Sequence, residues 1–214
     1  MIISWLGFSC FKIQIKDLVL LTDPFGPETG LRGVKIKADI VTVSHNHSDH
    51  SYVSGIIGEP FIIDSPGEYE VKDVYIVGFP AFHDNQDGKE RGSNIIYRYV
   101  VEGMVLVHLG DLGHLLSEEM VDALGDVDIL FVSAGSKNAL SSDKIPELIS
   151  QIEPRLVIPM HYDLPGAKKE RNLEPLSKFC EEMGISPESQ LDKLKIREKD
   201  LTSEGTEIKI LKKQ

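Results

Sequence analysis

Three histidines and one aspartate lie close together in the segment His45-Asn46-His47-Ser48-Asp49-His50. A neutral imidazole offers one nitrogen lone pair to a metal ion, and carboxylate oxygen binds the same divalent ions. Strand side chains alternate, so in an extended segment His45, His47 and Asp49 point to one side. His50 is adjacent to Asp49 and points elsewhere, so the segment could supply ligands to two neighbouring metal ions. A polar turn that contains histidine by chance is the alternative, and the spacing disfavours it.

Apolar runs precede this segment and three further residues with metal-ligating groups. Ile40–Ser44, directly before the histidines, is almost wholly apolar and predicts a central strand covered on both faces. His83, Asp111 and His161 each come after an apolar run and before a loop. Such positions place polar groups at the rim of a sheet, where functional sites are commonly built.

The other elements give the two halves of the chain different characters. The first half is rich in short β patterns, whereas helical patterns alternate with strands in the second half. This order favours two sheets packed face to face with helices outside, in one domain over residues 1–214. The other predicted strands are Ile2–Trp5, Cys10–Ile15, Leu18–Thr22, Phe61–Ile63, Val74–Val77, Ile95–Val100, Met104–His108, Asp128–Ser133, Leu156–Met160 and Glu207–Leu211. The predicted helices are Leu116–Leu124 with Ser117 as N-cap, Ser142 to about Ile152, Leu173–Met183, and a short one from Pro187.

The pattern His-x-His-x-Asp-His after a buried strand resembles the signature of the metallo-β-lactamase superfamily. Within it, the chain is similar to a subgroup of metal-dependent hydrolases related to ascorbate-6-phosphate lactonase. The stretches that carry this likeness are Trp5-Leu6-Gly7-Phe8-Ser9, Thr22-Asp23-Pro24-Phe25, Ser65-Pro66-Gly67-Glu68-Tyr69-Glu70, Gly110-Asp111-Leu112-Gly113-His114 and Pro154–Tyr162. The resemblance implies an α/β fold, a four-layer αββα sandwich, with metal ions at one edge.

The resemblance also implies two divalent metal ions and a ligand set for them. The implied ligands are His45, His47 and His83 for the first ion, Asp49, His50 and His161 for the second, and Asp111 as a carboxylate that bridges both. Zinc or manganese suits such a mixed nitrogen and oxygen set, and so does iron. The third histidine can be shifted or replaced within the subgroup, so substrate binding is the alternative role of His83, and ligation is favoured by its order in the chain and its context.

Three further polar residues lie outside the implied ligand set, and two of them have alternative interpretations. Asp23 either orients a ligand histidine or starts a turn before proline. His114 either approaches the site or caps the following loop, and the second reading is favoured. His108 is expected to pack or hydrogen-bond internally.

Substrate contact is the expectation for Arg91, Asn94 and Lys137, with a surface position as the alternative. A phosphate or carboxylate on the substrate would suit these side chains. The residues of the loop Asp84–Gly92, which precedes Asn94, suggest flexibility.

The composition restricts the partners. A formal net charge of −11 disfavours a nucleic-acid duplex, since no basic face would neutralise its phosphates. No apolar run is long enough to span a membrane, and Met1–Gly7 has no secretory features, which predicts a cytoplasmic protein. Cys10 and Cys180 are expected to be buried thiols. A small molecule is the expected partner, and a homo-oligomer is an open option.

The expected reaction is hydrolysis by a metal-activated water on a small anionic substrate, either a lactone or other ester or a phosphodiester. Asp49 would orient the nucleophile or pass on its proton, and Asp111 would hold the two ions together. A metal-binding regulatory or scaffold protein without turnover is the alternative. Di-iron oxidoreductase chemistry is disfavoured because the chain has no room for a flavin domain. RNA processing is disfavoured because no long insertion separates Asp111 from His161.

Overall fold

Two β-sheets form the body of the protein in the computed structural model, which describes residues 1–169 and 172–214. The first sheet has the strand order β13-β1-β2-β3-β4-β5. Its pairs β3–β4 and β4–β5 are parallel, and its remaining pairs are antiparallel. The strands are β1 (Ile2–Gly7), β2 (Cys10–Ile15), β3 (Leu18–Thr22), β4 (Ile40–Thr42), β5 (Phe61–Ile63) and β13 (Leu194–Lys195).

The second sheet has the order β14-β11-β10-β9-β8-β7-β6. Strands β9, β10, β11 and β14 are parallel neighbours, whereas β6, β7, β8 and β9 are joined as antiparallel hairpins. The strands are β6 (Gly67–Val71), β7 (Val74–Phe82), β8 (Ser93–Val101), β9 (Met104–His108), β10 (Ile129–Ser133), β11 (Leu156–Met160) and β14 (Glu207–Ile208). A separate pair joins β12 (Gln190–Leu191) to β15 (Ile210–Leu211).

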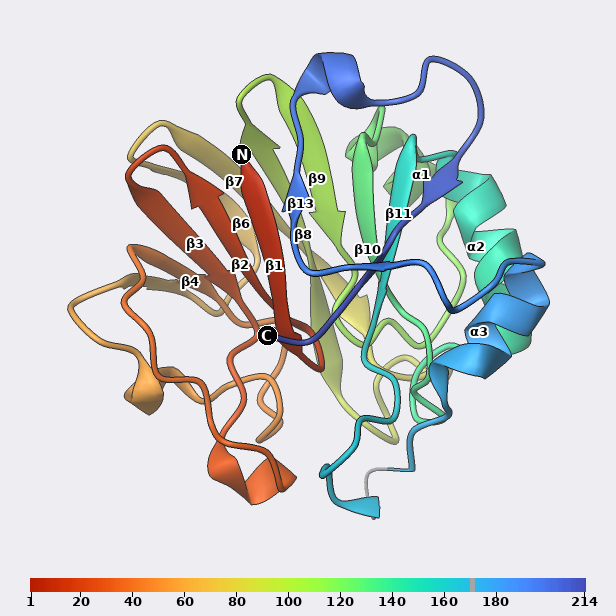
Figure 1. The fold of residues 1–214 in the computed structure, drawn as a ribbon, viewed down its shortest axis with the longest axis horizontal. Coiled ribbons are helices and arrows are strands. Elements are labelled where there is room, and N and C mark those ends of the chain that lie inside the picture. The colour runs from red at the N-terminus through yellow and green to blue at the C-terminus, as the bar shows by residue number, and fades with distance from the viewer. Residues whose placement is uncertain (170–171) are drawn as a thin grey trace.

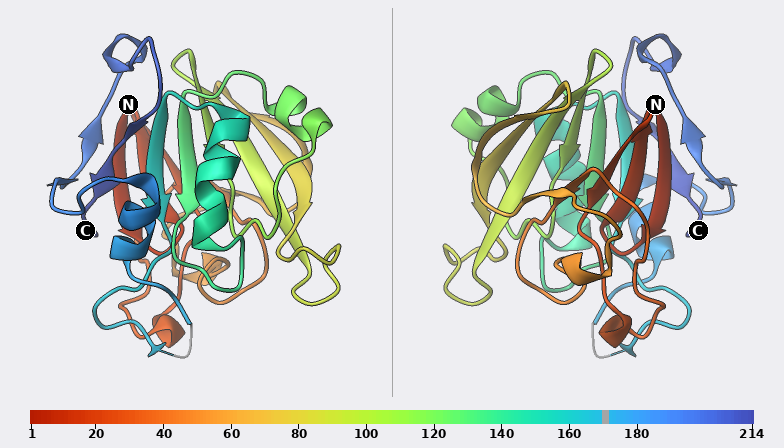
Figure 2. Two further views of the ribbon diagram at one scale, coloured as in Figure 1. Left: turned by 90° about the vertical axis from the view of Figure 1, so that its right-hand side faces the viewer. Right: turned by 90° about the vertical axis from the view of Figure 1, so that its left-hand side faces the viewer.

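Helices α1 (Glu118–Leu124), α2 (Ile145–Ile152) and α3 (Leu176–Met183) all lie on the outer side of the second sheet (Figures 1 and 2). In the described residues, no α-helix covers the outer face of the first sheet (Figure 2, right). The predicted α/β fold with two packed sheets is confirmed, and the α-helices of the described residues form one layer on the second sheet. Helical patterns occur only in the second half of the sequence, and their helices pack on the sheet that contains β10 and β11.

Aromatic side chains hold the two sheets together. Phe11 of β2 packs on Phe131 of β10, with ring centroids 4.4 Å apart. The hydroxyl of Tyr99 on β8 hydrogen-bonds to Thr42 of β4 at 2.7 Å. Tyr97, also on β8, donates to the carbonyl of Val43 at 3.0 Å. Burial of the large aromatic surface drives the packing of the two sheets. Each of the two tyrosine hydroxyls has a hydrogen-bond partner, which offsets the cost of removing it from water.

The direction of the strands brings several loops to one edge of the sandwich. Strands β7, β9, β10 and β11 run the same way, since β7 and β9 are both antiparallel to β8. In the first sheet β3 and β4 are parallel to each other. The segments that follow these strands contain Asp23, His45, His83, Asp111 and His161, and the contacts described below show that they meet.

The predicted bounds of β2, β3, β5, β9 and β11 are confirmed. The helix predicted from Pro187 is wrong, because Gln190 and Leu191 pair with the C-terminal strand β15. Strand β6 was missed, since its largely exposed residues lack an apolar face. No helix of the described residues is both long and apolar enough to cross a membrane.

Candidate metal centre

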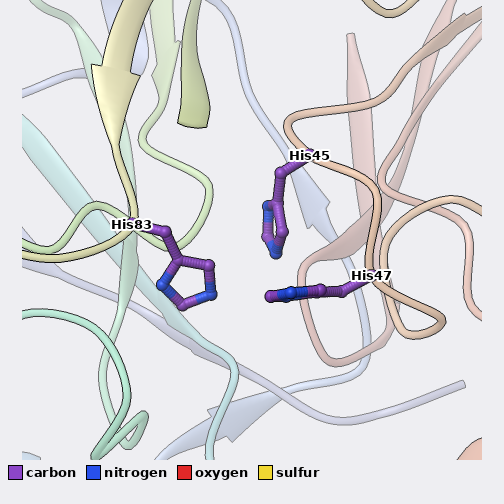
Figure 3. Close-up of side chains that lie close together, drawn as sticks. All are labelled: His45, His47 and His83. Carbon is purple, nitrogen blue, oxygen red and sulfur yellow. The ribbon is translucent and has the colours of Figure 1, made fainter. Parts of the chain in front are cut away.

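Seven polar side chains converge at the shared edge of the two sheets. They form three overlapping groups in which the potential ligand atoms all lie within 4.8 Å of one another. The groups are His45, His47 and His83; His45, His50 and Asp111; and Asp49, His50 and His161. Figure 3 shows the rings of His45, His47 and His83 turned toward a common space, with His83 on the opposite side from the other two.

Three buried imidazole nitrogens in these groups have no hydrogen-bond partner: His45 Nε2, His50 Nε2 and His83 Nδ1. Leaving a buried polar atom unpaired is costly, and native structures rarely do it without a reason. Two of the three, His45 Nε2 and His50 Nε2, belong to one candidate group with Asp111. Imidazole nitrogens with a carboxylate form a donor set that divalent metals bind well. The residues therefore fit a metal centre.

Asp23 sets the protonation of two of these histidines. Its Oδ2 atom lies 2.8 Å from His50 Nδ1 and 2.6 Å from the Ser44 hydroxyl, which donates to it. Because the Ser44 proton is committed to Asp23, the serine oxygen accepts from His45 Nδ1 at 2.9 Å. An ionised carboxylate only accepts, so His50 Nδ1 donates. Both histidines thus carry a proton on Nδ1 and direct Nε2 at the centre, which is the orientation that a metal ligand needs.

Asp23 remains ionised in this position. Burial alone would raise the pKa of Asp23, but the hydrogen bond from His50 and the nearby histidine charges lower it overall. The same network reaches the backbone, since the Ser44 amide donates to Asp23 Oδ1 at 2.7 Å. The predicted contact between Asp23 and a candidate ligand histidine is confirmed. Ser44 was missed, since a serine at a strand end carries no distinctive signal.

His161 joins two carboxylates. Its Nδ1 lies 2.5 Å from Asp111 Oδ1, and its Nε2 lies 3.3 Å from Asp49 Oδ2. Burial would lower the pKa of His161, but Asp111 and Asp49 raise it to about 10. Conversely, although burial would raise the pKa of Asp111, His161 and His50 hold it well below its usual range. Two carboxylates around one cationic ring show that this end of the site favours positive charge.

The histidine end of the site has the opposite character. Burial, followed by the charge of His50, lowers the pKa of His45 to about 2. Burial likewise lowers the pKa of His83 and of His47. These three rings are therefore neutral near pH 7, which is the form that binds metal.

Asn94 holds the loop that carries Asp111. Its side-chain nitrogen donates to the Leu109 carbonyl at 2.9 Å, and its oxygen accepts from the Asp111 amide at 3.1 Å. Asn94 is completely buried, and a Cβ at Gly110 would lie 2.3 Å from its oxygen. Only glycine suits this close approach at a φ of +57°. The expected substrate contact of Asn94 is therefore corrected, because both ends of its amide are committed to the backbone.

A pocket of about 370 Å³ opens over the candidate ligands. Its lining residues are His47, Ser48, Asp49, His83, Arg91, Asp111, Ser136, Asn138, His161, Lys168 and Leu173. Arg91 thus lies in the pocket, whereas Lys137 is exposed and lines a neighbouring hollow. The contact of Lys137 with substrate stays a prediction, and its neighbours Ser136 and Asn138 line the pocket itself. Lys168 was missed, because it lies in a charged loop without a motif.

The loop that carries Arg91 is held by one carboxylate. Asp84 accepts four backbone N–H bonds, from Gln86, Gly88, Glu90 and Arg91, at 2.7 to 3.0 Å. Burial would raise the pKa of Asp84, but these bonds lower it. The side chain at the start of the loop thus binds backbone amides along the loop as far as Arg91, and the flexibility that its composition suggested stays a prediction.

The two remaining histidines lie outside the ligand groups. His108 Nε2 donates to the Ser9 carbonyl at 2.9 Å, and its Nδ1 accepts from the Gly110 amide at 3.2 Å. His114 Nδ1 donates to the Leu115 carbonyl at 2.8 Å, and its Nε2 accepts from the Phe82 amide. The internal hydrogen bonding predicted for His108 is confirmed, and so is the loop-capping interpretation of His114.

A model of the family described as "Beta-lactamase superfamily domain" matches residues 2–161, which include every candidate ligand. The chain belongs to the metallo-β-lactamase superfamily. Among members of the superfamily, a crystal structure from Thermotoga maritima, described as a proposed Zn-dependent hydrolase, has a TM-score of 0.78. Its sequence is 29% identical to this chain, and the match covers 99% of each.

Two further relatives extend the comparison. A protein of Methanopyrus kandleri named a metal-dependent hydrolase is 25% identical, over 87% of this chain and 94% of its own length. The isothiocyanate hydrolase of Delia radicum gut bacteria has a TM-score of 0.67 at 12% identity, over 100% of this chain and 97% of its own. The likeness to the isothiocyanate hydrolase shows that the two proteins share a fold.

Proposed function

We propose that this superfamily member is a dinuclear metal-dependent hydrolase of a small anionic substrate. The observation that carries the proposal is the convergence of buried, unpaired imidazole nitrogens with carboxylates in three overlapping ligand groups. Relatives that match nearly the whole chain are named metal-dependent hydrolases, which supports the same activity. Zinc and manganese are the first metals to test, followed by iron.

The two ions would be held by different parts of the ligand set. His45, His47 and His83 would hold one ion. Asp49, His50 and His161 would hold the other, and Asp111 would bridge them. When bound, the ions would supply Lewis acidity and a water acidic enough to serve as nucleophile near neutral pH.

The residues of the chain have separate tasks around this chemistry. Asp49 lines the pocket, so its carboxylate can orient the attacking water or accept its proton. Asp23 and Ser44 keep His45 and His50 in the tautomer that binds metal. Asn94 fixes the backbone at Asp111, and Arg91, which lines the pocket, would contact the substrate.

The bond that is broken is a lactone or other ester, or a phosphodiester. A pocket lined almost wholly by polar and charged side chains suits a small polar molecule. Lactones bearing a phosphate are the first substrates to examine, because the sequence resembles relatives of ascorbate-6-phosphate lactonase. A panel of lactones, esters and phosphodiesters would distinguish the alternatives.

The test is elemental analysis of protein purified without an affinity tag or added metal, followed by the substrate panel. We expect two transition-metal ions per chain, and loss of both metal and turnover in Asp111→Ala. Asp126→Ala, which removes an exposed carboxylate elsewhere, is the matched control. Normal metal content in Asp111→Ala would contradict the bridging role. Two bound ions without turnover on any substrate would favour the regulatory or scaffold protein.

A further inference from the structure

Two cationic side chains in the pocket have no ion-pair partner among residues 1–169 and 172–214. Arg91 comes from the loop after β7, and Lys168 comes from the loop after β11. Neighbouring cations on the same loops do have partners, since Lys89 pairs with Asp87 at 3.6 Å and Lys169 with Asp163 at 2.7 Å. What sets these two cations apart is their place in the pocket beside the candidate metal groups, in a chain with a net charge of −11.

The backbone under both cations is fixed, although their side chains are exposed. The Arg91 amide donates to Asp84 at 2.7 Å, within the four-bond arrangement that holds its loop. The Lys168 amide donates to the Thr29 carbonyl at 2.9 Å, which ties its loop to the segment after β3. A Cβ at Gly30 would lie 2.9 Å from the Lys168 nitrogen, so the two segments are in close contact. Fixed backbones with uncommitted charged ends reduce the ordering cost of binding a ligand.

Among the described residues, the rest of the pocket wall offers no acid to neutralise these cations. Apart from the candidate ligand residues, the wall consists of Arg91, Lys168 and four uncharged side chains, Ser48, Ser136, Asn138 and Leu173. The only acids in the described wall are Asp49 and Asp111, which belong to the candidate metal groups. An anionic ligand group is therefore the complement of this part of the pocket.

We propose that the substrate carries a second ionised group, a phosphate or a carboxylate, away from the bond that is broken, and that Arg91 and Lys168 bind this group. The proposal rests on the hydrolase function, which places the scissile bond at the metal ions. The planar guanidinium of Arg91 presents a fork of donors that matches either anion, and Lys168 adds a point charge. The pair selects substrates by charge and takes no part in bond cleavage.

The first experiment compares three 4-nitrophenyl esters of similar size on the metal-loaded enzyme. The neutral ester is the butanoate, and the anionic esters are the hemisuccinate and the 3-phosphonopropanoate. We expect kcat/KM to be at least tenfold higher for one of the anionic esters, and the better one identifies the anion. Arg91→Gln and Lys168→Gln should each lower the ratio of anionic to neutral kcat/KM by roughly tenfold or more. Equal values for the three esters would overturn the proposal while leaving the hydrolase function in place.

The second experiment measures binding without turnover. Calorimetry with succinate and with 3-phosphonopropanoate on the metal-loaded protein should show at least tenfold weaker binding of the preferred anion in the double variant Arg91→Gln/Lys168→Gln. Lys89→Gln and Lys169→Gln are matched controls on the same loops and should bind as the wild type does. Unchanged affinity in the double variant would contradict the anion site. Weakened binding in the double variant, together with a wild-type enzyme that cleaves none of the esters, would support the anion site and count against esterase activity.

Discussion

The carboxylate of Asp23 lies 2.8 Å from Nδ1 of His50, and both side chains are completely buried. The same oxygen accepts from the Ser44 hydroxyl, which in turn accepts from His45. His45 and His50 belong together in one of the candidate ligand groups, and each also belongs to a second group without the other. One carboxylate behind the site therefore orients ligands for both proposed metal ions.

Replacing Asp23 by Asn should weaken metal binding more than it weakens the fold. The amide loses the charge that holds a proton on His50 Nδ1, and removal of such supporting partners typically costs about 10- to 100-fold in metal affinity. Competition with a chromogenic chelator measures this change. Asp126→Asn is the matched charge control on the surface. Wild-type metal affinity in Asp23→Asn would show that the contact is only structural.

Replacing His83 by Gln should remove one of the two proposed ions. His83 belongs to the group with His45 and His47, whereas the group of Asp49, His50 and His161 remains complete. We expect the metal content to fall from two ions to one per chain in elemental analysis. His114→Gln is the matched control, because His114 lies outside every ligand group and only caps a loop. Two ions retained in His83→Gln would assign His83 to substrate binding.

Replacing Asp84 by Ala should release the loop that carries Arg91. The substitution removes the acceptor of four backbone N–H groups, including that of Arg91 itself. Hydrogen–deuterium exchange should become faster throughout residues 84–92, and the selectivity for anionic substrates should fall. Asp87→Asn, an exposed carboxylate in the same loop, should leave both unchanged. Wild-type exchange in Asp84→Ala would show that other contacts hold the loop.

The metal-free protein should lose stability as the pH rises above neutrality. Asp111 and Asp49 raise the pKa of His161 to about 10 in the folded chain, against about 6.5 in an unfolded one. A raised folded-state pKa gives stability that is fully present below about pH 6.5 and is lost as the pH rises toward about 10. Urea unfolding of chelator-treated protein at pH 7 and at pH 9.5 measures the loss.

The His161→Gln variant isolates this contribution from the other groups that titrate at high pH. It should show a smaller loss of stability between pH 7 and pH 9.5 than the wild type shows. An equal loss in both proteins would mean that the ring of His161 is not protonated in the metal-free state. Metal should also suppress the loss in the wild type, because a bound ion replaces the proton.

Much of the candidate site could be predicted from the sequence because its residues follow apolar strands. The ends of parallel strands meet at one edge of a sheet, so residues that follow such strands lie close together in the fold. Asp49, Asp111 and His161 illustrate this, since they follow different strands and lie in contact. Residue type strengthened the prediction of a metal centre, because histidine is uncommon in this chain.

Other parts depended on tertiary contacts that no local pattern records. Lys168 joins the pocket because its loop packs on Thr29, which lies far away in the sequence. Asn94 is buried because Gly110 allows the backbone of another strand to approach its amide. The short strand at Gln190 forms only by pairing with the end of the chain. In each case the partner is distant, so propensity and periodicity could not indicate the outcome.

The candidate ligands are spread along the chain from His45 to His161, and the structure joins them only when both sheets are assembled. During synthesis the ribosome releases His45, His47 and His50 long before β9 and β11 exist. The complete ligand set therefore forms only after most of the chain has been made. An ion that needs the full set of ligands can therefore bind only after β11 and His161 have been made.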